Sequence, residues 1–460
     1  MKGFRILISI VFGLLGVMFF LSHTVMAARN VQKDIQSSLP WSRNLEPVII
    51  TGSQVTLFSG VDIATLYAYA YSGGEWTQIP LQIDEVNSLG EYSIEDGLLD
   101  ENDELVFLAK DIGEKAGETD WIGDSSSKNN HRYQLQITNP LTPTEVGYVY
   151  LYQSDTISPT HVDYIDWVSG TQEIVSEIYS MGIITSPLQR EESLILNGND
   201  VDVLDRSKYR LRVRCRLGGV GPFIIDVNED YIEAIFVDFY NFEPNFDGPV
   251  RVGGGSLSWK NWSYPAMRTS QFGINFDFLS TQVCEFQFVN FGRFEEFRFS
   301  FDWLDPLTST MRNYYDSNHS TAVDIDGSPD LLAVSPLKTW SQVSGDYGSV
   351  VRLTNLSQNA IGEYQNYYKD DSSIDYDDTG DQMSYGDSGF LIEFAKPPEP
   401  AQNEYGTLEV DMVEFFLGPN SPNVGQSYLD YKENPFQVLV TSQEFYLEIF
   451  FPMIFKGNTE

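Results

Sequence analysis

The stretch RSKYRLRVRCR, residues 206–216, carries a basic residue at every even position. The basic residues are Arg206, Lys208, Arg210, Arg212, Arg214 and Arg216, and the residues between them are Ser207, Tyr209, Leu211, Val213 and Cys215. Side chains of a β-strand alternate between its two faces. This spacing therefore predicts a strand with one basic face and one face suited to a hydrophobic core.

Similar alternation elsewhere in the chain predicts the fold class. It is visible in YVYLYQ (148–153), CEFQFVNF (284–291) and FEEFRFSFDW (294–303). Aromatic residues make up 14% of the chain, and 36 Gly and 21 Pro punctuate short apolar runs, which is typical of strands joined by turns. Long helical periodicity is nearly absent. We therefore expect an all-β protein.

The length and the turn-rich stretches predict more than one domain. We expect residues 45–155 to form an N-terminal β-sandwich and residues 156–190 to form a connector. Residues 191–460 are expected to form a larger antiparallel β-sandwich or supersandwich. Within this last domain, residues 407–417 and 436–454 have the pattern of strands that need a sheet to join.

The N-terminus has the features of a secretory signal peptide over residues 1–27. Lys2 and Arg5 precede an apolar run, and Val25 and Ala27 have the small-residue spacing of a cleavage site. No later segment is apolar for long enough to span a membrane. We therefore expect a protein that is secreted or held at the cell surface.

Composition excludes several classes of function. The formal net charge of −38 opposes binding to nucleic acid and to anionic membranes. Only 4 His occur, too few and too far apart to suggest a His-rich metal site. Cys215 and Cys284 are able to form a disulfide in an exported protein, or to remain as two free thiols. No G-x-S-x-G nucleophile motif is present.

The basic face of 206–216 has two interpretations. Carboxylates of neighbouring strands, such as Asp226 or Glu295, would neutralise it from within the protein. Alternatively, it lines a groove for a polyanion, whose carboxylates or sulfates the guanidinium groups would bind in pairs. The ligand-binding residues would then be Arg210, Arg212, Arg214 and Arg216, with Tyr209, Trp259 and Trp262 stacking on sugar rings.

Two acidic loops are candidates for calcium, because hard cations prefer clustered oxygen ligands. The first, DIDGSPD, offers Asp324, Asp326 and Asp330, and the second, IDYDDTGD, offers Asp375, Asp377, Asp378 and Asp381. The alternative for each is a solvated acidic loop with no bound ion.

Two short segments resemble known families. FDGPVRVGGG (246–255) is similar to a Gly-Pro-x-Arg segment in exported proteins of the galactose-mutarotase-like supersandwich type, many of which handle carbohydrates. That resemblance implies a concave antiparallel sheet with a polar face, to which Arg251 would contribute. WTQIPLQIDEV (76–86) and the following LDENDELVF resemble the opening domain of exported bacterial β-sandwich proteins of unassigned activity.

Taken together, the sequence predicts an extracellular carbohydrate-binding protein, for an acidic polysaccharide, with calcium-stabilised loops. A polysaccharide lyase or glycoside hydrolase is one alternative, and it needs a His or Tyr, or two carboxylates, close together in the cleft. A surface structural or adhesion protein is the other alternative, and it needs each guanidinium to be paired internally.

Overall fold

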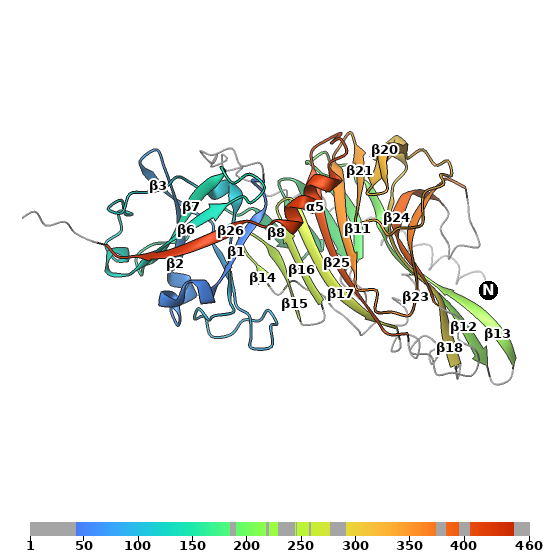
Figure 1. Cartoon of the computed structure of the whole chain (residues 1–460), viewed down its shortest axis with the longest axis horizontal. Coiled ribbons are helices and arrows are strands. Elements are labelled where there is room, and N and C mark those ends of the chain that lie inside the picture. The colour runs from blue at the N-terminus through green and yellow to red at the C-terminus, as the bar shows by residue number, and fades with distance from the viewer. Residues whose placement is uncertain are drawn as a thin grey trace, which may run out of the picture. The chain divides into compact units, whose positions relative to one another are not determined.

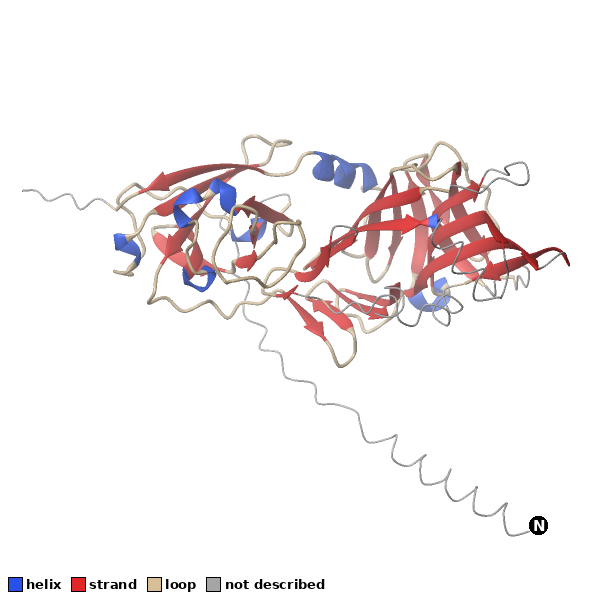
Figure 2. Cartoon of the chain, turned by 90° about the horizontal axis from the view of Figure 1, so that it is seen from below, coloured by secondary structure: helices blue, strands red, loops and turns tan. Residues whose placement is uncertain are grey.

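The computed structural model describes residues 43–184, 190–217, 220–228, 244, 246–256, 259–276, 291–373, 383–394 and 405–445. Strands dominate this part of the chain, and the helices in it are short (Figure 2). The all-β prediction is confirmed. Two sandwich-like assemblies make up this part of the chain.

The N-terminal assembly consists of two antiparallel sheets that enclose one hydrophobic core. The first sheet has the order β1–β5–β4, with β1 at Pro47–Thr51, β4 at Gln82–Asp84 and β5 at Glu104–Leu108. The second sheet has the order β26–β6–β7–β2–β3, with β2 at Leu66–Ser72, β3 at Glu75–Ile79, β6 at Arg132–Thr138, β7 at Val146–Gln153 and β26 at Gln437–Gln443. Short 3-10 turns lie at Gly52–Gln54, Thr56–Phe58, Ile63–Thr65, Ala109–Asp111 and Ser127–Asn129. Ile50 and Phe107 of the first sheet share the core with Leu135, Val149 and Leu151 of the second.

The last described strand belongs to the N-terminal assembly. Strand β26 pairs antiparallel with β6, from Gln437 opposite Thr138 to Gln443 opposite Arg132 (Figure 1). Val438 and Val440 pack against the N-terminal core. The expected domain over 191–460 therefore does not hold this strand, because the sheet that accepts it lies within 45–155.

The expected connector contains strands of its own. Strands β8 (Ile165–Val168), β9 (Glu173–Ser176), β10 (Tyr179–Ile184) and β11 (Arg190–Leu196) form a four-stranded antiparallel meander. Its apolar side chains join the core of the second assembly.

The second assembly is a sandwich of a nine-stranded and a five-stranded sheet. The nine-stranded sheet has the order β14–β15–β16–β17–β25–β22–β21–β19–β20, and its strands are β14 (Phe246–Asp247), β15 (Val252–Ser256), β16 (Trp259–Tyr264), β17 (Met267–Asn275), β19 (Met311–Asp316), β20 (His319–Asp324), β21 (Trp340–Gly345), β22 (Ser349–Leu356) and β25 (Thr407–Leu417). The five-stranded sheet has the order β13–β12–β18–β24–β23, and its strands are β12 (Leu204–Leu217), β13 (Val220–Val227), β18 (Phe291–Trp303), β23 (Gly362–Asp371) and β24 (Ser384–Phe394). The helix α4 (Pro306–Ser309) joins β18 to β19.

Alternation along β12 works as the sequence predicts. Leu211 and Val213 are buried in the core between the two sheets, where they meet phenylalanines of β18 such as Phe297 and Phe299. The even-numbered basic residues consequently lie on the opposite face of the five-stranded sheet.

The core of the second assembly also contains charged groups. Arg268, Glu414 and Arg352 face one another across β17, β25 and β22, and all three are buried. Arg352 Nε donates to Glu414 Oε1 at 2.7 Å, and Arg268 pairs with both Glu414 and Glu191. The two arginines are thus balanced by two carboxylates inside the protein.

The other face of the nine-stranded sheet packs on a separate apolar cluster. Val413 and Phe415 meet Val106 and Leu108 of β5 there, together with side chains of helix α5 (Gly425–Glu433).

Candidate functional site

Two basic residues of β12 are paired with carboxylates of neighbouring strands. Arg212 Nε lies 2.7 Å from Asp226 Oδ1 on β13, and Arg214 Nε lies 2.5 Å from Glu295 Oε1 on β18. This is the cross-strand pairing that was the alternative to a polyanion groove. These two guanidinium groups are therefore not left open for a polyanion. The side chain of Arg216 lies outside the described residues.

Lys208, on the same face, is buried between two carboxylates. Its Nζ lies 2.6 Å from Asp302 and 3.7 Å from Asp387, and all three side chains are at most 2% exposed. Burial raises the pKa of Asp302 to about 8. The ammonium of Lys208 lowers this pKa, whereas the negative charge of Asp387 raises it. The raised pKa favours the protonated form of Asp302 in the folded chain.

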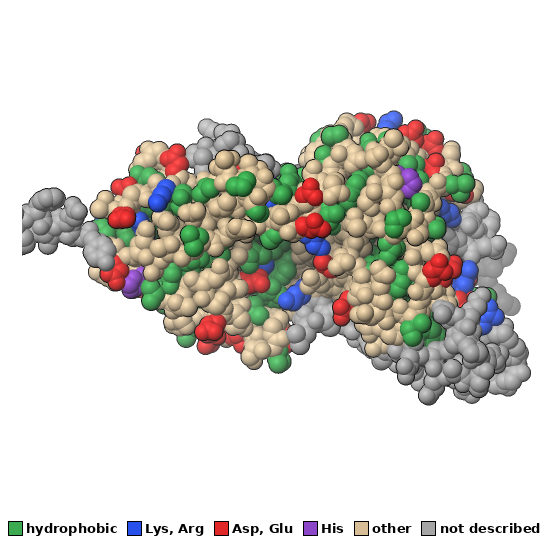
Figure 3. Space-filling model, viewed as in Figure 1, with side chains coloured by type: hydrophobic (Ala, Val, Ile, Leu, Met, Phe, Trp, Pro, Cys, Tyr) green, Lys and Arg blue, Asp and Glu red, His purple; other side chains and the backbone are tan. Residues whose placement is uncertain are grey.

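The rest of this face is mixed in charge. Arg212 of β12 lies opposite Glu296 of β18. In the same row across the sheet, Glu296 lies opposite Glu393 of β24, and Glu393 lies opposite Glu363 of β23. Arg210 is only 5% exposed. Figure 3 shows one side of the whole molecule, and on that side the described basic side chains lie singly among acidic and uncharged ones. An acidic polymer along β12 would meet repelling carboxylates as well as guanidinium groups.

Arg251 is a buried structural residue. It is 1% exposed and donates to Asp84 from Nε at 2.8 Å and to Glu104 from Nη2 at 2.7 Å. Its guanidinium also lies 3.6 Å from the ring centre of Trp262 and donates to Tyr264 at 3.2 Å. These contacts satisfy the cation within the protein.

The aromatic residues expected to stack on sugar lie elsewhere. Tyr209 packs against Phe299, with ring centres 4.7 Å apart. Trp262 is 4% exposed and packs edge-on against Tyr92. The side chain of Trp259 lies outside the described residues, although its backbone pairs within β16. Tyr209 and Trp262 thus serve the cores.

The first acidic loop is held by a carboxylate of another strand. Asp370 Oδ2, on β23, accepts the backbone N–H groups of Asp326 at 2.9 Å and Gly327 at 3.0 Å. Asp326 Oδ1 accepts from the backbone of Ser328. Within the described ranges, no group of three or more His, Cys, Asp or Glu side chains is arranged to hold a metal ion. The second loop, with Asp375, Asp377, Asp378 and Asp381, lies outside the described residues.

A different surface gathers side chains suited to a ligand. The face of sheet β26–β6–β7–β2–β3 that points away from the core carries aromatic rings beside glutamine amides. Tyr71 lies opposite Trp76, and Tyr69 lies between Gln78 and Tyr150. We call this surface the aromatic face. It consists of Tyr67, Tyr69, Tyr71, Trp76, Tyr148, Tyr150, Tyr152, Gln78, Gln134, Gln136 and Gln443.

Trp76 is the centre of this ring cluster. Its ring centre lies 4.9 Å from those of Tyr71 and Tyr150 and 5.8 Å from that of Tyr152. Tyr150 and Tyr152 are fully buried, and Trp121 covers Tyr152. The rings that keep a partly exposed surface are Tyr69, Tyr71, Trp76 and Tyr148.

A buried arginine contacts the rings of the aromatic face and holds them in position. Arg132 is 0% exposed, and its guanidinium lies 4.4 Å from the ring centre of Trp121 and 4.9 Å from that of Tyr150. It donates to Tyr152 Oη at 2.9 Å and to Gln443 Oε1 at 2.7 Å. The rings and the amide are therefore held in place before any ligand arrives.

The partly exposed rings also have polar groups at their edges. Tyr148 Oη donates to Gln136 Oε1 at 3.4 Å, and Tyr71 Oη donates to Asp120 Oδ2 at 3.3 Å. Hydroxyl and amide groups of this kind orient a ligand by hydrogen bonds, while the flat rings cover its apolar C–H surface.

This surface was not predicted from the sequence, although the signal was present. LYAYAYS (66–72) and YVYLYQ (148–153) place tyrosines at alternate positions and smaller or aliphatic residues between them. That pattern marks one face as aromatic, but it does not say which strands bring their rings together.

Comparisons with known proteins give slight similarities. No protein-family model matches the sequence, and no curated protein matches it. One similar solved structure is a protein in glycosyl hydrolase family 38 from Enterococcus faecalis, with a TM-score of 0.38, 9% identity, and coverage of 87% of this chain and 46% of that chain. Another is an alpha-mannosidase from Enterococcus faecalis V583, with a TM-score of 0.36, 9% identity, and coverage of 87% and 44%. The chain spans less than half the length of these two proteins. No helix among the described residues is long and apolar enough to cross a membrane.

Proposed function

We propose that the protein binds a carbohydrate outside the cell and that the aromatic face is its binding surface. One observation carries this proposal: four partly exposed rings lie beside glutamine amides on one fixed sheet face. Sugars present flat C–H patches bordered by hydroxyl groups. An aromatic ring packs on the former, and an amide, with both a donor and an acceptor, bonds to the latter.

The chemistry of the aromatic face favours an uncharged carbohydrate. Its one buried cation, Arg132, is fully occupied by Tyr152, Gln443 and the surrounding rings. The pairing of Arg212 and Arg214 removes the earlier reason to expect an acidic ligand. The net charge of −38 also repels polyanions at long range.

Export and calcium remain parts of the proposal. The pattern over residues 1–27 supports export. Burial and the nearby charges of Asp326 and Asp324 raise the pKa of Asp330, so these carboxylates repel one another. A calcium ion between them would relieve that repulsion, although the three side chains are not gathered into a metal-binding group in the structure.

The test compares the aromatic face with the basic strand. Mature protein is run through native gels that contain soluble neutral glucan, mannan or xylan, or polyuronate. We expect at least one neutral polymer to retard the wild type, and Trp76→Ala to weaken that retardation at least about tenfold, as expected for a central aromatic anchor.

The matched control is Trp167→Ala, which removes a partly exposed tryptophan from the four-stranded meander. It should leave retardation unchanged. If no neutral polymer retards the wild type, or if Trp76→Ala binds as the wild type does, the aromatic face is not the binding surface. Loss of binding in Arg212→Ser/Arg214→Ser alone would place the ligand on the basic strand.

A further inference from the structure

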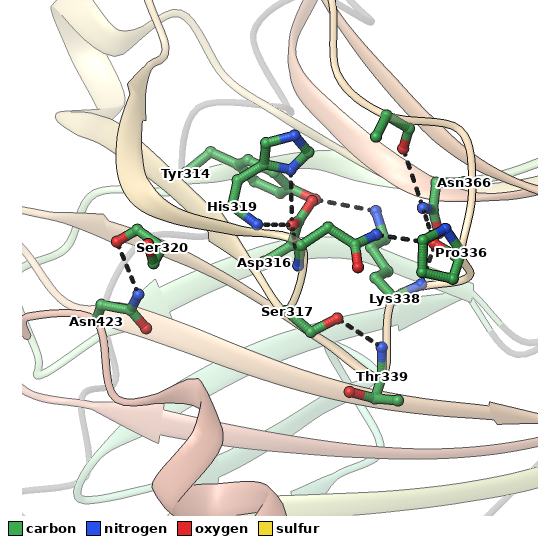
Figure 4. A network of polar contacts seen from close by, with 12 residues as sticks. Tyr314, Asp316, Ser317, His319, Ser320, Pro336, Lys338, Thr339, Asn366 and Asn423 are labelled. Atoms are coloured by element: carbon green, nitrogen blue, oxygen red, sulfur yellow. Dashed lines mark hydrogen bonds and ion pairs between the residues drawn. The ribbon is translucent and has the colours of Figure 1, made fainter.

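A chain of hydrogen bonds links a buried amine to a partly exposed histidine in the second assembly (Figure 4). Lys338 Nζ donates to Tyr314 Oη at 3.0 Å, and Tyr314 Oη donates to Asp316 Oδ2 at 3.0 Å. Asp316 Oδ1 lies 2.9 Å from His319 Nδ1. The four residues come from strands β19 and β20 and from the loop before β21.

The fold holds the carboxylate of this chain rigidly. Asp316 Oδ1 also accepts the backbone N–H groups of Asn318 and His319, each at 2.8 Å, and so closes the turn between β19 and β20. Tyr314 is 0% exposed and the Asp316 side chain is 3% exposed, whereas the His319 side chain is 25% exposed. Among Tyr314, Asp316 and His319, the imidazole is therefore the group that a solute reaches.

The hydrogen bonds also fix which ring nitrogen is available. A neutral imidazole that donates from Nδ1 to Asp316 carries its lone pair on Nε2. Burial and the charge of Asp316 raise the pKa of Tyr314, which therefore stays a donor to that carboxylate. Burial lowers the pKa of Lys338 to about 8, although the charge of Asp316 opposes this.

The other described histidines lack this arrangement. His131 Nδ1 lies 3.7 Å from Glu444, beyond hydrogen-bond distance, and its side chain is 38% exposed. His161 is exposed, and among the described contacts its ring has no hydrogen bond. His319 is thus less exposed than His131 and is the one oriented by a carboxylate.

We propose that His319, oriented by Asp316, is the general base of a second site, which hydrolyses an uncharged acyl ester. His319 Nε2 takes a proton from water while the water oxygen bonds to the ester carbonyl carbon. The bond from that carbon to the alcohol oxygen then breaks, its electron pair stays with the alcohol oxygen, and the imidazolium returns the proton there. A carboxylic acid and an alcohol leave, and no redox partner or cofactor takes part.

The surroundings select this class of substrate. Glycosidic bonds need a carboxylic acid beside the leaving oxygen, and Asp316 is fully engaged in the turn. Phosphoesters are anionic and would be repelled by the net charge of −38. An uncharged ester avoids both problems. Thr321, two residues after His319 on β20, has an exposed side chain.

The test uses the full chain with glucose pentaacetate, an uncharged ester with poor leaving groups, and measures acetate release. We expect His319→Gln to lower the rate above background by roughly tenfold or more, as for the loss of a general base. The double variant His131→Gln/His161→Gln, which removes the more exposed rings, should stay within about twofold of the wild type.

A solvent isotope effect tests the mechanism without any substitution. Hydrolysis by the wild type should be clearly slower in D₂O, because the base moves a proton of water in the slow step. Equal rates for His319→Gln and the wild type would overturn the proposal, as would equal losses in all histidine variants or equal rates in H₂O and D₂O. None of these results depends on whether the aromatic face binds carbohydrate.

Discussion

The buried carboxyl of Asp302 gives this protein a pH-dependent stability that one substitution should remove. Burial raises the pKa of Asp302 from its ordinary value of 3.8 to about 8 in the folded chain. Between these values the folded state keeps a proton that the unfolded state has lost. The folded state binds more protons, so the free energy of unfolding falls as the pH rises, and this contribution is lost above about pH 8.

The magnitude follows from one proton. Each pH unit within this window lowers the free energy of unfolding by about 1.4 kcal/mol, or about 4 kcal/mol between pH 5 and 8. Asp302→Asn cannot ionise and is close in shape to the protonated acid. Its carbonyl oxygen is able to accept the backbone N–H of Tyr385, which Asp302 Oδ1 accepts at 2.8 Å.

The assay is urea unfolding at pH 5, 6, 7 and 8 for the wild type and Asp302→Asn. Titrating groups other than Lys208 and Asp387, which interact with Asp302, act in both proteins and cancel in the difference. We expect the variant to gain stability relative to the wild type by about 1.4 kcal/mol per pH unit. Asp346→Asn, at a side chain that is 53% exposed, is the control and should run parallel to the wild type. Parallel curves for Asp302→Asn would refute the reasoning, because they would mean that Asp302 is ionised throughout.

Two further predictions concern the other charged groups. Glu414→Gln should lower the free energy of unfolding, measured in urea, by about 3–5 kcal/mol, because Arg268 and Arg352 would lose a shared buried counterion. Glu409→Gln, at an exposed position of the same strand, is the control and should change this free energy far less. Equal effects of the two substitutions would contradict a special role for the buried network. Chelation with EDTA should lower the melting temperature and added Ca²⁺ should restore it, if the acidic loops bind calcium; a melting temperature that EDTA leaves unchanged would remove the ion from the proposal.

The candidate site was predictable only in part. Alternation identified β12 correctly as a strand with one basic face, because the two faces of a strand follow from local geometry. It could not assign Asp302 to Lys208, since these residues lie 94 positions apart in the chain. Asp226, 14 positions from Arg212, and Glu295 were among the carboxylates that the sequence offered as partners.

The sequence by itself determined the all-β class and, for the strand at 206–216, the face that turns to a core. These properties depend on residues two apart, and alternation records them directly. Only the tertiary structure decided that the strand at Gln437–Gln443 returns to the N-terminal sheet, that the basic strand is neutralised from its neighbours, and that tyrosines of β2 and β7 meet Trp76 and Arg132. The reason is that pairing and register between distant strands depend on how whole sheets bury their apolar faces, which no short segment specifies.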